Sequence, residues 1–76
     1  MASGPIQTRF FELAGGAAQA RLTDLAAHLR RGGTRATLLQ SREEPDLYLL
    51  VVEAEQLPEL AVPEGCRVWT FQRVDV

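Results

Sequence analysis

The central hydrophobic run of this chain extends from Leu47 to Val52 and contains six apolar or aromatic side chains in succession. Residues 42–46 before it are polar or turn-forming, and acids follow it at positions 53 and 55. A short apolar run between such boundaries is typical of a β-strand that is buried on both faces. The pattern predicts a strand over Leu47–Ala54. Because alternate side chains of a strand point to opposite faces, both of its apolar faces need cover.

Three further segments carry β-forming residues with rough alternation. They are Ile6–Leu13, Thr34–Ser41 and Arg67–Val74. In the first of them Phe10 and Phe11 are adjacent, so in a regular strand they point to opposite faces. This strand, like the central run, is therefore expected to be covered on both sides.

Residues 17–31 repeat their apolar side chains with helical spacing. One stripe consists of Ala18, Leu22, Leu25, Ala26 and Leu29. Arginines at positions 30 and 31 close the segment, where cations interact favourably with the carbonyl end of a helix, and Gly32–Gly33 supply a left-handed cap. The pattern predicts a helix that covers one face of a sheet. A second helical segment at residues 55–60 is limited by Pro58 to one turn at most.

The order of these elements is strand, helix, strand, strand, shortened helix, strand, which is that of the ferredoxin-like α+β fold, βαββ(α)β. The five residues between the second and third strands favour an antiparallel hairpin. We expect one domain over residues 6–76, built as a four-stranded antiparallel sheet with one main helix, after a flexible N-terminus at residues 1–5. A single helix leaves the second face of the sheet bare.

The bare face predicts self-association. Leaving three large apolar side chains of the central strand in water forfeits roughly 5–9 kcal/mol, which is comparable with the whole stability of a small domain. An exposed apolar face of this kind marks an association site. We expect a homodimer in which two sheets pack face to face, although the sequence leaves open which face lies under the helix. The residues assigned to the interface are Tyr48, Leu50, Val52 and Trp69.

Composition narrows the range of partners. The net charge of −2 is unlike the basic character of nucleic-acid-binding domains, and no apolar run reaches the roughly 20 residues that a membrane helix needs. The N-terminus has no basic start followed by an apolar core, and a single cysteine forms no intrachain disulfide. We therefore expect a cytoplasmic protein with no nucleic-acid or membrane partner. Eight arginines without a lysine are typical of a GC-rich bacterial genome.

The final predicted strand carries the most distinctive side chains. On one of its faces two aromatic residues lie between two arginines: Arg67, Trp69, Phe71 and Arg73. Such a face can form a pocket wall that stacks a planar or anionic ligand through cation–π and bidentate contacts. It can equally be a half-buried strand whose aromatic residues pack in the core or the dimer interface, with the arginines at its rim. Both interpretations stay open.

The remaining candidate residues favour structural roles. His28, the only histidine, lies off the apolar stripe without a partner at metal-ligand spacing, and we expect it to be dispensable. Cys66 is expected to be structural, because no base is close to it in the sequence. Gly15–Gly16 match no phosphate-binding motif, and the acids of residues 43–46 lack the spacing of a calcium site. We assign no catalytic residue, metal site or cofactor.

Two stretches of the sequence resemble a known family. SREEPDLYLLVVEAEQ, residues 41–56, resembles the central hairpin of antibiotic biosynthesis monooxygenase-like domains, and LTDLAAHLRRGGTRATLLQ, residues 22–40, resembles the helix and strand before it. Those domains belong to the dimeric α+β barrel superfamily, in which two ferredoxin-like sheets face each other. The resemblance implies a homodimer that binds a small apolar or planar ligand between its sheets. The shortened second helix and the lack of any asparagine depart from the family, so no catalytic residue is carried over.

A second resemblance supports an alternative of another class. Gly15–Gly16 with the following ARLTDLAAHLRRGG is similar to the strand–helix opening of ACT regulatory domains, which bind small metabolites at interfaces between domains. This resemblance implies a non-catalytic regulatory or protein-interaction module. A polar cavity between the sheets would favour an enzyme, whereas a filled, dry interface would favour the module.

Overall fold

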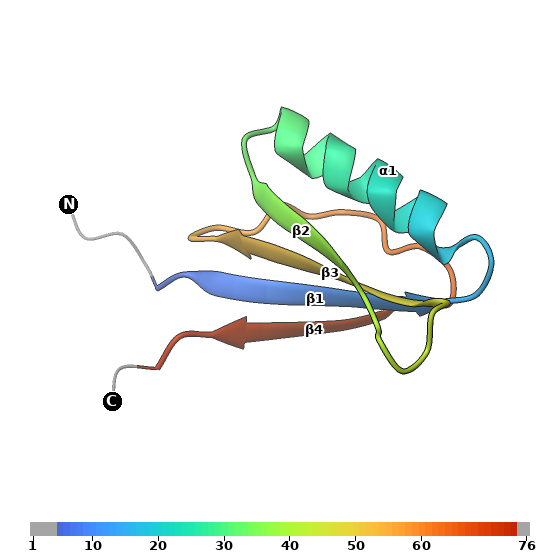
Figure 1. The fold of residues 1–76 in the computed structure, drawn as a ribbon. Helices are drawn as coiled ribbons and strands as arrows, with labels where there is room; N and C mark the ends of the chain where they lie inside the picture. The colour runs from blue at the N-terminus through green and yellow to red at the C-terminus, as the bar shows by residue number, and fades with distance from the viewer. Residues whose placement is uncertain (1–4, 75–76) are drawn as a thin grey trace.

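The computed structural model describes residues 5–74, which form one helix packed on one sheet (Figure 1). The elements are β1 (Gln7–Ala14), α1 (Ala18–Arg31), β2 (Arg35–Gln40), β3 (Leu47–Ala54) and β4 (Arg67–Gln72). The four strands lie in the order β2-β3-β1-β4, and each neighbouring pair is antiparallel. This is the ferredoxin-like α+β fold that the order of elements predicted. The predicted flexible N-terminus lies outside the described residues, apart from Pro5.

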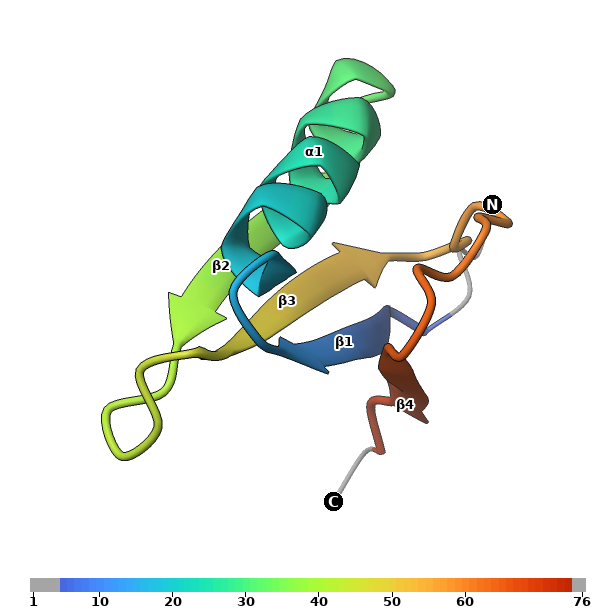
Figure 2. The same cartoon turned by 90° about the vertical axis from the view of Figure 1, so that its right-hand side faces the viewer.

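The core lies between α1 and three of the four strands. Helix α1 packs on β2, β3 and β1, as Figure 2 shows, and not on β4. The predicted helical stripe is confirmed: four of its five members are buried and Leu25 is partly buried. The buried hydrophobic residues are Phe11, Leu13, Ala18, Leu22, Ala26, Leu29, Ala36, Leu50 and Val52.

The helical turn anticipated near Pro58 does not form. Residues 55–66 run as an irregular connection on the helix side of the sheet, and Leu57 and Leu60 pack against the core (Figure 1). Arg9 of β1 holds this connection, because its guanidinium donates to the carbonyl oxygen of Pro58 at 3.5 Å and to the hydroxyl of Thr70 at 2.9 Å. A short, proline-containing connection thus lies where a second helix would pack in a complete ferredoxin-like fold.

Helix α1 ends in a left-handed glycine cap, as predicted. Gly33 has φ +85°, and its N–H donates to the carbonyl oxygen of Arg30, while the N–H of Thr34 donates to that of Leu29. These two bonds are those of the Schellman motif. The chain then turns directly into β2, which places that strand under the helix.

Replacing Gly33 by alanine is expected to lower the free energy of unfolding by about 1 kcal/mol, because an L-residue is strained at positive φ. A Cβ at this position meets no atom within 4 Å, so the cost lies in the backbone alone. Gly32→Ala is the matched control, since Gly32 has φ −85° and its Cβ would make an ordinary contact. Urea denaturation of both variants measures the difference. Equal losses would contradict the assignment of the cap to Gly33.

Among the described residues, no helix is long and apolar enough to cross a membrane.

Candidate functional site

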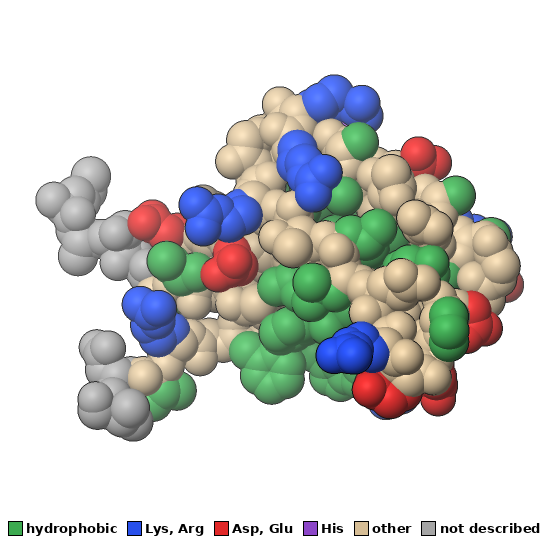
Figure 3. Space-filling model, viewed as in Figure 1, with side chains coloured by type: hydrophobic (Ala, Val, Ile, Leu, Met, Phe, Trp, Pro, Cys, Tyr) green, Lys and Arg blue, Asp and Glu red, His purple; other side chains and the backbone are tan. Residues whose placement is uncertain are grey.

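The face of the sheet turned away from α1 has no covering layer, and we call it the open face. The strand register shows which residues belong to it. Phe11 points into the core and is paired with Leu50 and Val68, which therefore point to the helix side as well. Each next residue in these strands points to the open face, as Phe10, Val51 and Trp69 do. Its residues are Thr8, Phe10, Glu12, Arg35, Thr37, Leu39, Leu47, Leu49, Val51, Glu53, Arg67, Trp69 and Phe71. Figure 3 shows hydrophobic side chains gathered over the sheet below the helix.

Large apolar side chains occupy the middle of the open face. Val51, Phe10 and Trp69 are Cα partners in successive strands and form one row across the sheet. Leu39 and Leu49 begin the next row and are followed in it by Glu12. Leu39 is 47% exposed in the single chain. The middle row of the open face is therefore apolar except for Thr37 at its edge, whereas the rows on either side of it mix apolar and polar side chains.

Three of the four predicted ligand-binding residues, Arg67, Trp69 and Phe71, lie on the open face. Arg67 and Trp69 lie at one end of it, and Phe71 lies towards the other end, next to Arg73. At one end, the guanidinium of Arg67 lies over the ring of Trp69, 4.9 Å from its centroid, and 3.7 Å from the carboxylate of Glu12. Both contacts are largely exposed, so each contributes at most about 1 kcal/mol to stability. Arg67 is thus occupied by contacts within its own chain.

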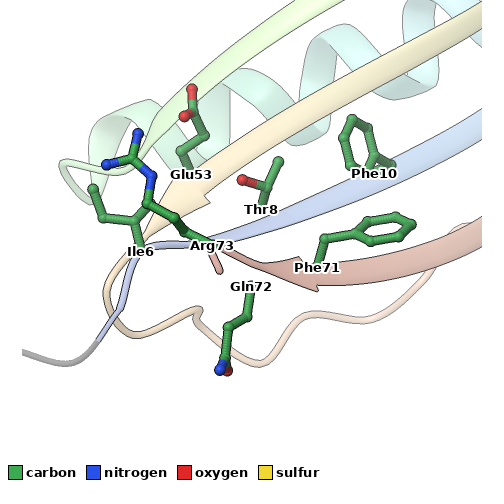
Figure 4. A pocket seen from close by; sticks show the side chains of 7 residues that line it. All are labelled: Ile6, Thr8, Phe10, Glu53, Phe71, Gln72 and Arg73. Atoms are coloured by element: carbon green, nitrogen blue, oxygen red, sulfur yellow. The ribbon is translucent and has the colours of Figure 1, made fainter. Parts of the chain in front are cut away.

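The other end of the face is hollowed. Phe71 and Arg73 line a hollow of about 420 Å³, together with residues from β1 and β3 (Figure 4). Its lining residues are Ile6, Thr8, Phe10, Glu53, Phe71, Gln72 and Arg73. The rings of Phe10 and Phe71 meet edge to face, with centroids 5.4 Å apart, and form its apolar side. The predicted pair Trp69 and Phe71 therefore lies along one strand, but only Phe71 reaches the hollow.

The sequence missed the partners of Phe71 and Arg73 because those partners come from other strands. Thr8 of β1 is the Cα partner of both Phe71 and Glu53, so one row of the sheet brings these three residues together. In the sequence Glu53 is only one of the acids that follow the central hydrophobic run. The only signal that could have found it is the strand order, which puts β1 between β3 and β4.

The predicted dimer-interface set needs correction. Leu50 and Val52 are 0% and 1% exposed and lie under α1, so they belong to the core of the single chain. Tyr48 lies on the same side, where its hydroxyl donates to Oε1 of Gln19 on the helix at 3.2 Å. Of the assigned residues only Trp69 lies on the open face. The residues of β3 that face outward are the alternate ones: Leu47, Leu49 and Val51.

The residues with predicted structural roles lie away from the open face or in turns. His28 is exposed on α1. Gly15 has φ +115°, and its N–H donates to the carbonyl oxygen of Asp46, so the glycine pair closes a turn beside the hairpin. In that hairpin the hydroxyl of Ser41 accepts from the N–H of Glu44. No three potential metal ligands of residues 5–74 come together.

Cys66 packs against the core at the start of β4, on the helix side of the sheet. Its burial raises the pKa of the thiol, and the negative charge of Glu12 raises it further. A raised pKa leaves less of the thiolate that reacts with alkylating agents at neutral pH. This environment favours the structural role that the sequence indicated.

Cys66 is expected to react with iodoacetamide several-fold more slowly in the folded protein than in urea at pH 8, because both its raised pKa and its packing protect the thiol. The rate should rise towards that of the unfolded chain as the pH is increased further. Mass spectrometry of timed, quenched samples gives both rates. Equal rates in the two states at pH 8 would show that Cys66 is exposed and unperturbed.

Comparisons with protein-family models, with curated proteins and with solved structures find no match for this chain. The resemblance to monooxygenase-like and ACT-like domains therefore stays a prediction. What the chain does has to be inferred from the open face and its hollow.

Proposed function

We propose that this chain acts as a homodimer whose two sheets pack with their open faces together and hold a small planar or apolar molecule between them. The observation that carries the proposal is the apolar row of Val51, Phe10 and Trp69 at the centre of the sheet, whose side chains are half-buried in the single chain and have no layer packed over them. In a fold of one helix on one sheet, nothing within the described residues covers this row. A second copy of the chain has the same apolar surface, and in a two-fold symmetric dimer the two identical surfaces cover each other.

The size of the uncovered surface supports a second copy as its partner. The accessible surface of the chain is 5614 Å², whereas about 4,600 Å² is expected for a folded monomer of 8.4 kDa. This excess of about 1,000 Å² includes the chain ends, so only part of it belongs to the open face. A standard interface buries ~800 Å² on each partner.

The charges of the open face also suit self-association. Glu12 and Glu53 stand on it with Arg35 and Arg67, so acids and bases are equal in number between Gln7 and Gln72. A balanced face meets its own copy without net repulsion. Nucleic acids bind to basic surfaces, and anionic membranes bind to clusters of basic residues. The open face is neither a basic surface nor a cluster of arginines.

Binding is favoured over catalysis because the most reactive side chains lie elsewhere. His28 is exposed on α1, and Cys66 packs on the helix side of the sheet. The hollow beside Phe71, of about 420 Å³, is open in the single chain, and a second sheet over it would give the enclosure that small-molecule sites have. The proposal agrees with the resemblance to the dimeric α+β barrel superfamily, in which the ligand lies between two sheets.

Trp69 provides the test, because it is the only tryptophan in the chain and lies in the central row. In the dimer its emission should be blue-shifted and poorly quenched by iodide, since the second sheet excludes water from its ring. Serial dilution should expose the ring, with a midpoint that depends on protein concentration. Leu57, which belongs to the connection on the opposite side of the sheet and is partly buried against the core, supplies the control: Leu57→Trp in a Trp69→Phe background should show no such dependence.

Emission from Trp69 that is freely quenched at every concentration would contradict the proposal. A shielded Trp69 in a dimer whose interface admits no small molecule would support instead the non-catalytic interaction module.

A further inference from the structure

We infer that the hollow binds a small zwitterion with an apolar or aromatic body, that is, an α-amino acid with a large apolar side chain. The inference rests on the proposed dimer and names the ligand class of the same face. It follows from how the lining side chains are distributed. Figure 4 shows the rings of Phe10 and Phe71 grouped at one end, and Glu53 and Arg73 at the other with the side chain of Ile6 beside them. Thr8 lies between the two ends.

The apolar end suits a ring or a branched chain. Phe10 and Phe71 meet edge to face at an interplanar angle of 77°, so their rings form a corner and not a flat wall. A third ring can complete an edge-to-face or offset contact with both of them. Phe71 is 56% exposed in the single chain, so this corner has room for an occupant.

The polar end carries one charge of each sign. The carboxylate of Glu53 and the guanidinium of Arg73 line the same hollow, and within residues 5–74 neither forms an ion pair. Arginine suits a carboxylate because its N–H groups donate to both oxygens at once. A carboxylate such as that of Glu53 accepts hydrogen bonds from an ammonium group, while the hydroxyl of Thr8, which lies between Glu53 and Phe71 in the sheet, can donate or accept.

In the proposed dimer the charges of Glu53 and Arg73 would be buried, and burying them without a ligand would cost free energy. When a second sheet closes over the open face, water leaves the hollow, and a buried charge without a partner costs several kcal/mol. A ligand with only a carboxylate satisfies Arg73 and leaves Glu53 to its cross-strand neighbour Arg35. A ligand with only an ammonium group satisfies Glu53 and leaves Arg73 without an acid. A zwitterion satisfies both, so the site should discriminate strongly against ligands that lack either group.

Three probes with the same phenyl ring test the inference: L-phenylalanine, 3-phenylpropionate without the ammonium group, and phenethylamine without the carboxylate. Titration calorimetry with the full chain should show L-phenylalanine binding at least tenfold more tightly than either of the others. Glu53→Gln should reduce the affinity for L-phenylalanine to that for 3-phenylpropionate, and Arg73→Gln should reduce it to that for phenethylamine. Glu12→Gln and Arg67→Gln are matched controls, because both residues lie on the open face outside the hollow.

Sedimentation equilibrium of each protein distinguishes failure of this inference from failure of the proposed function. A dimer that binds all three probes equally, or none of them, overturns the zwitterion and leaves the face-to-face dimer standing. In that case Glu53 and Arg73 would be satisfied by the charges of the second copy. A wild-type protein that stays monomeric overturns both, because no second sheet then closes the hollow.

Discussion

Replacing Phe11 by alanine is expected to lower the free energy of unfolding by about 3–5 kcal/mol, which is a large part of the about 5–15 kcal/mol that stabilises a typical domain. Phe11 is 1% exposed and lies in the core cluster with Leu22 and Leu50. Removing its ring leaves a cavity that the backbone of β1, paired on both sides, cannot close. Circular dichroism during urea denaturation measures the loss.

The adjacent residue gives a matched control for Phe11. Phe10→Ala removes the same side chain from the same strand, but from the open face. We expect Phe10→Ala to weaken dimerisation and to leave the monomer able to fold, so that its stability depends on protein concentration. If the two variants lost the same stability with the same concentration dependence, the assignment of faces would be wrong.

Val51→Arg is expected to weaken the dimer at least a hundredfold. Val51 lies in the central row of the open face, between Thr37 and Phe10, so an arginine there would be buried beneath the second sheet. By symmetry the dimer would contain two such charges without partners, and each costs several kcal/mol. Analytical ultracentrifugation over a concentration series measures the dissociation constant.

Ala20→Arg is the control for added charge, because Ala20 is exposed on α1 and far from the open face in the fold. The expected result is an unchanged dissociation constant for Ala20→Arg beside a strongly raised one for Val51→Arg. The same small effect from both substitutions would mean that Val51 does not lie in an interface.

The elements could be predicted because each has a strong local pattern. The strand Leu47–Ala54 has the bounds that its apolar run indicated, and the stripe of α1 is buried as its spacing indicated. The glycine cap and the polar residues of the β2–β3 turn, which spans residues 41–46, mark where the helix and the strands end. Local periodicity was sufficient for the fold class.

The assignment of faces could not be obtained from the central strand, because both of its faces are equally apolar. The edge strand β2 shows which face of the sheet lies under the helix. Its small residue Ala36 packs under α1, whereas Arg35 and Thr37 face outward. A helix can approach the sheet closely over an alanine but not over an arginine. Interpreting β3 alone assigned Leu50 and Val52 to the interface, and the burial of both under α1 corrects it.

The hollow could be predicted only in part for a related reason. Phe71 and Arg73 are close in sequence and were selected together, whereas Thr8 and Glu53 are brought to them by pairing across β1. Such pairing depends on strand order and register, and neither is encoded in a single strand. The separation of Arg67 and Trp69 from Phe71 and Arg73 also depends on the pairing of β4 with β1.

The most direct test of the homodimer is sedimentation equilibrium of the unmodified protein at micromolar concentration. Two sheets packed by their open faces predict a single species with twice the chain mass of 8.4 kDa. A folded, stable species of 8.4 kDa would contradict it, because the row of Val51, Phe10 and Trp69 would then remain in water.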